Sequence, residues 1–113
     1  MMYKGTVQKG GAYGHTLGFP TANIMYDGSV GGIYAAKVRF LGKEYQAAVY
    51  ADQRNKVLEA HILDFSDDLY DMEIEVELLK KIREDRKFET ADEAKETIAA
   101  DVVAVREHFK GVH

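Results

Sequence analysis

The segment Thr21-Ala22-Asn23 follows Pro20, the only proline of the chain, and carries two neutral side-chain oxygens at a spacing of two. If Pro20 begins an extended segment, the side chains of Thr21 and Asn23 lie on the same side of it. A hydroxyl and an amide oxygen are weak, hard ligands, and such a pair suits Mg²⁺ when phosphate groups supply most of the charge. The alternative is that both side chains satisfy nearby backbone groups.

A second pair with the same spacing, Glu59 and His61, lies in the stretch LEAHILDF. In a strand, alternation places this pair on the face opposite Leu58, Ala60 and Ile62, which are typical core residues. A carboxylate in a cleft can act as a general base toward a hydroxyl group. The commoner alternative is a glutamate that is simply solvated.

Three more features could meet a ligand. Arg83, Arg86 and Lys87 cluster in the stretch KKIREDRKF, and guanidinium groups suit both phosphates and planar rings. Phe88 could stack on such a ring or pack at the start of a helix. Tyr70 lies at an expected turn, where its ring could pack while its hydroxyl stays exposed. For the charged cluster, solvation is the simpler interpretation.

A glycine-rich run, KGGAYGHTLG, precedes all of these residues. Its glycines, which include Gly10, Gly14 and Gly18, would let backbone N–H groups approach an anion closely. The spacing matches neither the P-loop nor the dinucleotide-binding fingerprint. A hairpin loop without a ligand is therefore the alternative.

Alternation of apolar and polar residues predicts about six short strands that would position these side chains. The expected strands cover residues 3–8, 21–26, 33–40, 44–51, 56–65 and 71–79. The connections between them are too short for helical crossovers, so antiparallel pairing is expected. The interior is expected to receive Ile74, Val76 and Leu78 from the last strand, with its glutamates facing water.

One helix is expected at the end of the chain. Thr90 and Glu93 form a capping-box pattern, and Gly111 suits the exit. An apolar stripe at steps of three and four follows the cap: Ala94, Ile98, Val102, Val105 and Phe109. The predicted fold is mainly β: a six-stranded antiparallel, Greek-key-like barrel with one C-terminal amphipathic α-helix, forming a single domain over residues 1–113.

Composition narrows the possible partners. The formal net charge is −4, so nucleic acid is not expected as a partner. The chain has no cysteine, which excludes disulfides and thiolate metal sites. The sequence shows neither a membrane-length apolar run nor a signal peptide, so a soluble, cytoplasmic protein without a membrane partner is expected. A monomer is the default expectation.

The order of these motifs resembles the riboflavin kinase family over essentially the whole chain. The elements, in order, are the glycine run, LGFPTANI, GIYAAKV, EAHILDF with DLY, and IREDRKF before a helix. LGFPTAN is a specific signature, and the others support it in order and spacing. The resemblance implies a six-stranded barrel with a helix. It also implies transfer of the ATP γ-phosphoryl group to the 5′-hydroxyl of riboflavin to give FMN, with Mg²⁺ as the cofactor.

The resemblance also implies roles for individual residues. Thr21 and Asn23 match the positions that hold Mg²⁺ and ATP, and Glu59 matches the catalytic carboxylate that takes the hydroxyl proton. Contacts with the flavin are implied for Arg83, Lys87 and Phe88. The nucleotide site implied by the resemblance includes Gly10, Gly14, His15, Gly18, Thr21, Asn23, His61 and Tyr70. Expected small-molecule partners are riboflavin or FMN and ATP or ADP.

Two segments depart from the family pattern. Where the family usually has Gly-x-Gly-Arg-Gly-Arg, this chain has Gly-Gly-Ala-Tyr-Gly-His, so Tyr13 and His15 replace the two arginines. A protonated His15 could replace part of the lost charge and make activity depend on pH. The usual Gly-x-x-Pro-Thr element is also missing, and the shorter YADQRNKV stands in its place. These departures motivate one alternative, a non-catalytic barrel that binds flavin or nucleotide. A barrel that serves only as a scaffold for protein contacts ranks last.

Overall fold

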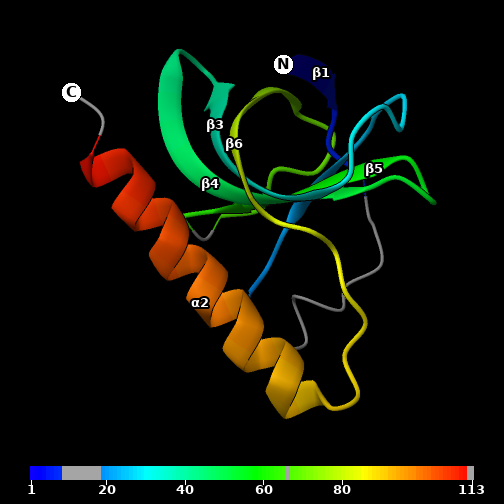
Figure 1. Cartoon of the computed structure of the whole chain (residues 1–113). Helices are drawn as coiled ribbons and strands as arrows, with labels where there is room; N and C mark the ends of the chain where they lie inside the picture. The colour runs from blue at the N-terminus through cyan, green and yellow to red at the C-terminus, as the bar shows by residue number, and fades with distance from the viewer. Residues whose placement is uncertain (9–18, 66, 112–113) are drawn as a thin grey trace.

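The computed structural model describes residues 1–8, 19–65 and 67–111, and within these ranges six strands form one antiparallel sheet (Figure 1). The strands are β1 (Met2–Thr6), β2 (Ala22–Met25), β3 (Gly32–Phe40), β4 (Lys43–Asp52), β5 (Val57–Ile62) and β6 (Glu73–Arg83). They are followed by the helix α2 (Ala91–Lys110). The strand order in the sheet is β1-β6-β3-β4-β5-β2.

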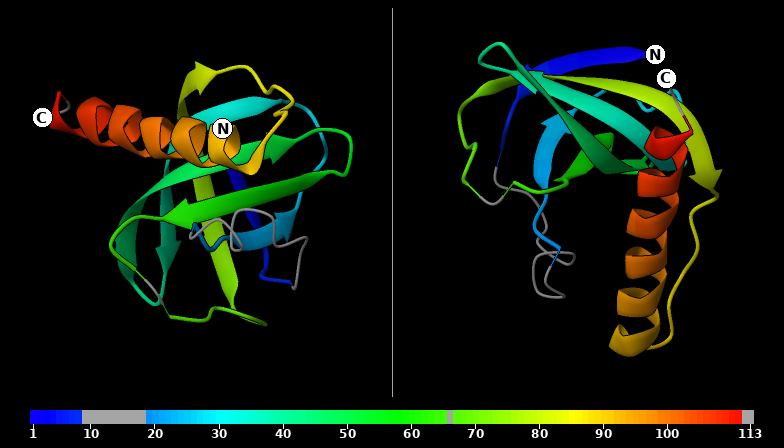
Figure 2. Two further views of the ribbon diagram at one scale, coloured as in Figure 1. Left: turned by 90° about the horizontal axis from the view of Figure 1, so that it is seen from below. Right: turned by 90° about the vertical axis from the view of Figure 1, so that its left-hand side faces the viewer.

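The two edge strands come together and nearly close the sheet into a barrel. Just after β1, the backbone N–H of Gln8 donates to the carbonyl oxygen of Asn23 in β2 at 2.8 Å, which forms an antiparallel bridge. A sheet that closes in this way leaves little unpaired edge. The structure confirms the predicted antiparallel, mainly β barrel with one C-terminal helix (Figures 1 and 2).

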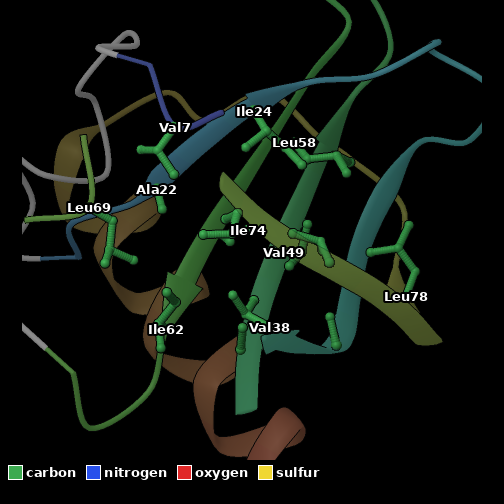
Figure 3. Close-up of a cluster of buried hydrophobic side chains, with 14 of the residues drawn as sticks. Val7, Ala22, Ile24, Val38, Val49, Leu58, Ile62, Leu69, Ile74 and Leu78 are labelled. Atoms are coloured by element: carbon green, nitrogen blue, oxygen red, sulfur yellow. The ribbon is translucent and has the colours of Figure 1, made fainter. Parts of the chain in front are cut away.

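The interior of the barrel is filled by alternate residues of the strands, whose side chains point toward one another in Figure 3. Ile24, Val38, Val49, Leu58 and Ile74 are each at most 1 % exposed. Burial of such side chains contributes roughly 1.5–3 kcal/mol each. Strand alternation thus predicted the inward face, as expected for a sheet with one buried side.

The helix α2 covers part of the outer face of the barrel. Ala35 of β3 and Ala48 of β4 are buried under it, in a second cluster with Leu63 and Val105. Alternation in β3 placed Ala35 on the face opposite the barrel core, and that face is apolar here because the helix packs on it. The expected cap is confirmed, since the Thr90 hydroxyl accepts a hydrogen bond from the backbone N–H of Glu93 at 3.1 Å.

The part of the chain that the structure describes contains no helix long and apolar enough to cross a membrane.

The first half of α2 projects past one side of the barrel, and residues 84–90 run beside it from the end of β6 (Figure 2). This arrangement leaves the outer faces of β4 and β5 next to a wall made by the helix and by the segment before it.

Gly32, at the start of β3, has a backbone conformation that other residues adopt only with strain, at φ 109°. A Cβ atom built there would lie 2.7 Å from the carbonyl oxygen of Arg83, which belongs to the backbone and cannot move aside. Gly42, in the turn between β3 and β4, also has positive φ, 72°, but open space around it.

We therefore expect Gly32→Ala to lower the free energy of unfolding by at least about 2 kcal/mol, because strain and a clash add together. Gly42→Ala is the matched control and should cost only about 1 kcal/mol. Urea unfolding followed by circular dichroism measures both values. Equal costs for the two variants would show that the close approach to Arg83 is not a constraint.

Candidate functional site

Two of the polar residues singled out in the sequence, Asn23 and Glu59, lie in a row with Tyr50 across three neighbouring strands. Asn23 of β2 is the cross-strand partner of Glu59 in β5, and Glu59 is the partner of Tyr50 in β4. All three side chains are on the outer face, because their neighbours along each strand fill the barrel. Asn23 is only 5 % exposed, and Glu59 is half-buried. The pairing of the strands therefore brings these groups together.

The segment before β2 is held by side-chain contacts. The Thr21 hydroxyl donates to Oδ1 of Asn23 at 2.9 Å, so the two oxygens lie side by side as their spacing predicted. Nδ1 of His61 lies 2.9 Å from the carbonyl oxygen of Pro20. Because a carbonyl oxygen can only accept, His61 donates from Nδ1 in this contact. The rings of His61 and Phe19 meet edge to face at 5.5 Å.

Two cavities share Thr21 as a lining residue. The first, called here the barrel-end cavity, has a volume of about 270 Å³ and is lined by residues that include Pro20, Ala22, Asp68 and Tyr70. The second, the helix-side cavity, has a volume of about 150 Å³ and lies between β5 and α2. Among the described residues, Thr21 is the one that lines both. Two ligands, one in each cavity, would therefore both lie close to Thr21.

The helix-side cavity combines apolar walls with a few polar groups. It is lined by Phe19, Thr21, Ile33, Ala48, Tyr50, Glu59, His61, Arg83, Asp85, Phe88, Ile98 and Asp101. Such a lining is typical of sites that enclose a small, largely apolar molecule and orient it by a few polar contacts.

Glu59 is a group in this cavity whose pKa is raised into the neutral range. Burial and, to a smaller extent, the negative charge of Asp52 together raise the pKa of its carboxyl to about 7. The pKa of Tyr50 is also raised, mainly by burial and then by its hydrogen bond to Asp85. Tyr50 therefore keeps its proton, and its hydroxyl donates a hydrogen bond to Oδ2 of Asp85 at 2.9 Å. A carboxyl that titrates near neutrality and lies in a cavity is a candidate proton acceptor.

Arg83, at the end of β6, is held by the helix. Its Nε and Nη2 each donate to a carboxylate oxygen of Asp101 at 2.8 Å. Its guanidinium group also lies 5.9 Å from the centre of the Phe88 ring. Lys87 is exposed and lines another cavity, which shares Phe88 with the helix-side cavity. The structure thus brings Arg83 and Phe88 to the helix-side cavity and leaves Lys87 outside it.

Of the described residues expected at a nucleotide site, Thr21 lines both cavities, Asn23 lines neither, and the other two line one cavity each. Tyr70 lines the barrel-end cavity together with Thr21. His61 lines the helix-side cavity, beside Glu59, and reaches the other side only through its contact with Pro20. The expectations for Gly10, Gly14, His15 and Gly18 lie outside the residues that the structure describes.

Four further residues of the site were not singled out in the sequence: Tyr50, Asp52, Asp85 and Asp101. Asp101 could have been found, because it interrupts the apolar stripe of the helix between Ile98 and Val105. The other three carry no comparable signal. Their importance comes from the pairing of β4 with β5 and from the path of residues 84–90.

The donor set at Thr21 and Asn23 fits a metal ion only in part. Both oxygens are neutral, and among the described residues there is no group of three or more His, Cys, Asp or Glu that could hold a metal. A hard divalent cation would therefore need charge from its ligand, as in a complex with phosphates.

The buried Glu59 carboxylate has a consequence for stability. Its pKa is raised from 4.5 to about 7 in the folded state, so its contribution to stability is complete below about pH 4.5 and is lost as the pH rises through 7. We expect Glu59→Gln to be more stable than the wild type at pH 8 by about 1–2 kcal/mol, a value discounted for partial exposure. The advantage should shrink toward pH 4.5.

Urea unfolding at pH 5 and pH 8 measures this difference. Glu73→Gln, at an exposed position on β6, is the control for the loss of one negative charge. A Glu59→Gln variant that is less stable than the wild type at pH 8 would contradict the raised pKa of Glu59.

Residues 1–109 match the flavokinase family, described as riboflavin kinase. A bifunctional riboflavin kinase/FMN adenylyltransferase of Escherichia coli is 40 % identical over 93 % of this chain and 37 % of its own length. The corresponding protein of Buchnera aphidicola from Acyrthosiphon pisum is 32 % identical over 93 % of this chain, again 37 % of its own length. A trifunctional protein, RibF/MnmA, of Mycoplasmoides gallisepticum is 39 % identical over 94 % of this chain but only 18 % of its own length.

The chain thus spans less than two-fifths of these relatives. A solved structure from Streptococcus pneumoniae, titled a macrolide-efflux protein, has the same fold over 93 % of this chain and 38 % of that chain, with a TM-score of 0.81 and 28 % identity. That title names a different activity, so the structural likeness supports the fold and the sequence matches carry the assignment. The chain belongs to the riboflavin kinase family.

Proposed function

We propose that residues 1–113 form a single riboflavin kinase domain, which transfers the γ-phosphoryl group of ATP to the 5′-hydroxyl of riboflavin and gives FMN. The observation that carries this proposal is that two cavities share Thr21 in their walls, with Glu59 in the wall of one of them. Phosphoryl transfer needs two substrates held end to end, with positioning and charge compensation at the point of contact. Family membership supports the same reaction.

The linings of the two cavities suggest which substrate each takes. The helix-side cavity has apolar walls and the Phe88 ring, which suit a flat aromatic system such as the flavin. Arg83 would contribute through its place beside Phe88, and Lys87 would lie at the outer edge. The barrel-end cavity, with Tyr70 in its wall, is then left for the nucleotide. His61 would act on the nucleotide side by holding the carbonyl of Pro20.

Charge at the barrel-end cavity favours a nucleotide that arrives with a metal ion. Asp67 and Asp68 line this cavity and would repel a bare triphosphate. Thr21 and Asn23 would hold Mg²⁺ through their neutral oxygens, and the ion would neutralise charge on the β and γ phosphates. The backbone of the glycine run at Gly10, Gly14, His15 and Gly18 would face the phosphates, by analogy with the family.

Glu59 would act on the hydroxyl that is phosphorylated. The hydroxyl oxygen forms a bond to the γ phosphorus, the bond from that phosphorus to the β–γ bridging oxygen breaks, and ADP leaves with the electron pair. The hydroxyl proton passes to the Glu59 carboxylate, whose pKa of about 7 makes it a stronger base than an ordinary glutamate. Because the ionised form is the base, the rate should fall as the pH drops below about 7.

A non-catalytic barrel that binds flavin or nucleotide is the second candidate. Tyr13 and His15 stand where the family usually has arginines, which would weaken the hold on the phosphates. The two candidates share the helix-side cavity and differ in turnover, so a single assay separates them.

Purified protein mixed with riboflavin, ATP and Mg²⁺ should form FMN, detected by separating the flavins chromatographically. Glu59→Gln should still bind riboflavin but turn over ~10²–10⁴-fold more slowly, because the proton acceptor is lost. Glu73→Gln is the control and should keep the wild-type rate. Riboflavin binding without FMN formation would favour the non-catalytic candidate, and near-normal turnover in Glu59→Gln would reject Glu59 as the base.

The metal assignment can be tested at Thr21, since valine has nearly the same shape as threonine but no hydroxyl. Thr21→Val should raise the Mg²⁺ concentration needed for half-maximal rate by about tenfold or more, because a metal ligand is lost. Thr21→Ser keeps the oxygen and should remain within a few-fold of the wild type. Equal Mg²⁺ requirements in all three proteins would show that this hydroxyl does not hold the ion.

A further inference from the structure

The ion pair between Arg83 and Asp101 lies in the wall of the helix-side cavity. Asp101 is 5 % exposed and points from the apolar face of α2 toward the barrel, where both of its oxygens accept from Arg83 at 2.8 Å. A buried ion pair often stabilises a protein no better than apolar residues of similar size. Docking of the helix alone therefore gives little reason for a charged pair at this position.

The pair fixes the point where the chain leaves the barrel. Arg83 is the last residue of β6, and its Nη1 also donates to the carbonyl oxygen of Glu84 at 3.0 Å. All three guanidinium nitrogens therefore donate hydrogen bonds, two to Asp101 and one to the Glu84 carbonyl. The group also lies 5.9 Å from the Phe88 ring centre. A guanidinium group next to an aromatic ring is a favourable arrangement, and it restricts the ring.

Other contacts position the rest of the segment from residue 84 to residue 90. Tyr50 holds Asp85 from β4, and Arg86 bonds to Glu93 of the helix at 2.8 Å while it lies 5.3 Å from the Phe88 ring centre. The side chain of Arg86 is about half exposed, whereas Asp101 and Arg83 are mostly shielded from water. Arg83 and Arg86 both lie near the Phe88 ring, and of these two arginines Arg83 is the one shielded from water.

A second pair of the same type ties the same helix to the barrel, through Arg106 in the last turns of α2. Arg106 donates through Nη1 and Nη2 to both oxygens of Asp64, at 3.2 and 3.0 Å. This pair is exposed, with the Asp64 side chain 77 % accessible, and neither residue lines the two cavities. Within the described ranges, two aspartate–arginine pairs hold this helix, and one of them is at the site, so the other serves as a control.

We infer that Asp101 is a positioning residue for the aromatic substrate: by holding Arg83 it keeps Phe88 in the wall of the helix-side cavity, so that a flat ring meets a preformed surface. This inference rests on the proposed function for the identity of the ring, riboflavin. A wall that is already ordered saves the cost of ordering side chains when the ligand binds. Loss of the carboxylate should therefore weaken ring binding and leave the chemical step intact.

The test compares Asp101→Asn with Asp64→Asn in the full chain. Riboflavin affinity is measured by quenching of flavin fluorescence, and KM and kcat by FMN formation. In Asp101→Asn we expect the Kd and KM for riboflavin to rise about tenfold or more, with kcat at saturation within threefold and the KM for ATP unchanged. Asp64→Asn should leave all four values unchanged, and Arg83→Lys should resemble Asp101→Asn because lysine lacks the planar fork.

Coupling to Phe88 separates positioning from general loosening of the helix. In a Phe88→Leu background, Asp101→Asn should change riboflavin affinity by less than twofold, because the ring it positions is gone. Hydrogen exchange of the backbone of residues 84–90 should be faster in Asp101→Asn than in Asp64→Asn. This measurement requires no flavin. If Asp101→Asn does not fold, Arg83→Lys and the Phe88→Leu background give the same comparison.

The inference is overturned if Asp101→Asn alters riboflavin affinity no more than Asp64→Asn does. It is also overturned if Asp101→Asn lowers riboflavin affinity by the same factor in the Phe88→Leu background as in the wild type. A wild-type protein that neither binds riboflavin nor makes FMN would overturn the proposed function, and this inference with it. If the wild type binds riboflavin and Asp101→Asn and Asp64→Asn bind it equally well, only the inference about Asp101 is overturned.

Discussion

The pairing of β2, β5 and β4 is the constraint on which the rest of the site depends. Because side chains alternate along a strand, Leu58 and Ala60 fill the barrel while Glu59, between them, is held on the outer face. Register then sets Asn23 on one side of Glu59 and Tyr50 on the other. A shift of one residue would bury the carboxylate in the core and expose the apolar residues, so the same packing that stabilises the barrel also aligns the site.

The helix turns this outer face into an enclosed site. Its apolar side packs on Ala35 and Ala48, and its first half projects past the barrel beside residues 84–90 (Figure 2). Burial under this cover raises the pKa of Glu59, whereas an exposed glutamate on a strand would be an ordinary acid. The ionised, half-buried Glu59 carboxylate therefore lowers the stability of the folded protein near neutral pH. Functional sites often keep such reactive groups at the expense of stability.

The sequence predicted the barrel because its strands alternate cleanly and its helix has a stripe and a cap. It predicted the closeness of Thr21 to Asn23 because that contact is local. It did not predict the Asp101–Arg83 pair or the role of Tyr50, since these contacts join segments distant in sequence. Nor could it divide the expected nucleotide residues between two cavities. Tyr70 lies between β5 and β6, outside the strands, and no local pattern predicts which cavity that connection lines.

The central claim is that two ligands meet at Thr21, one in each cavity. The most direct measurement is a crystal structure of the protein with FMN, ADP and Mg²⁺ bound together. We expect the flavin ring against Phe88 in the helix-side cavity, ADP in the barrel-end cavity, and the FMN phosphate between them beside Thr21 and Glu59. Flavin bound away from Glu59, or both ligands in a single cavity, would contradict the claim.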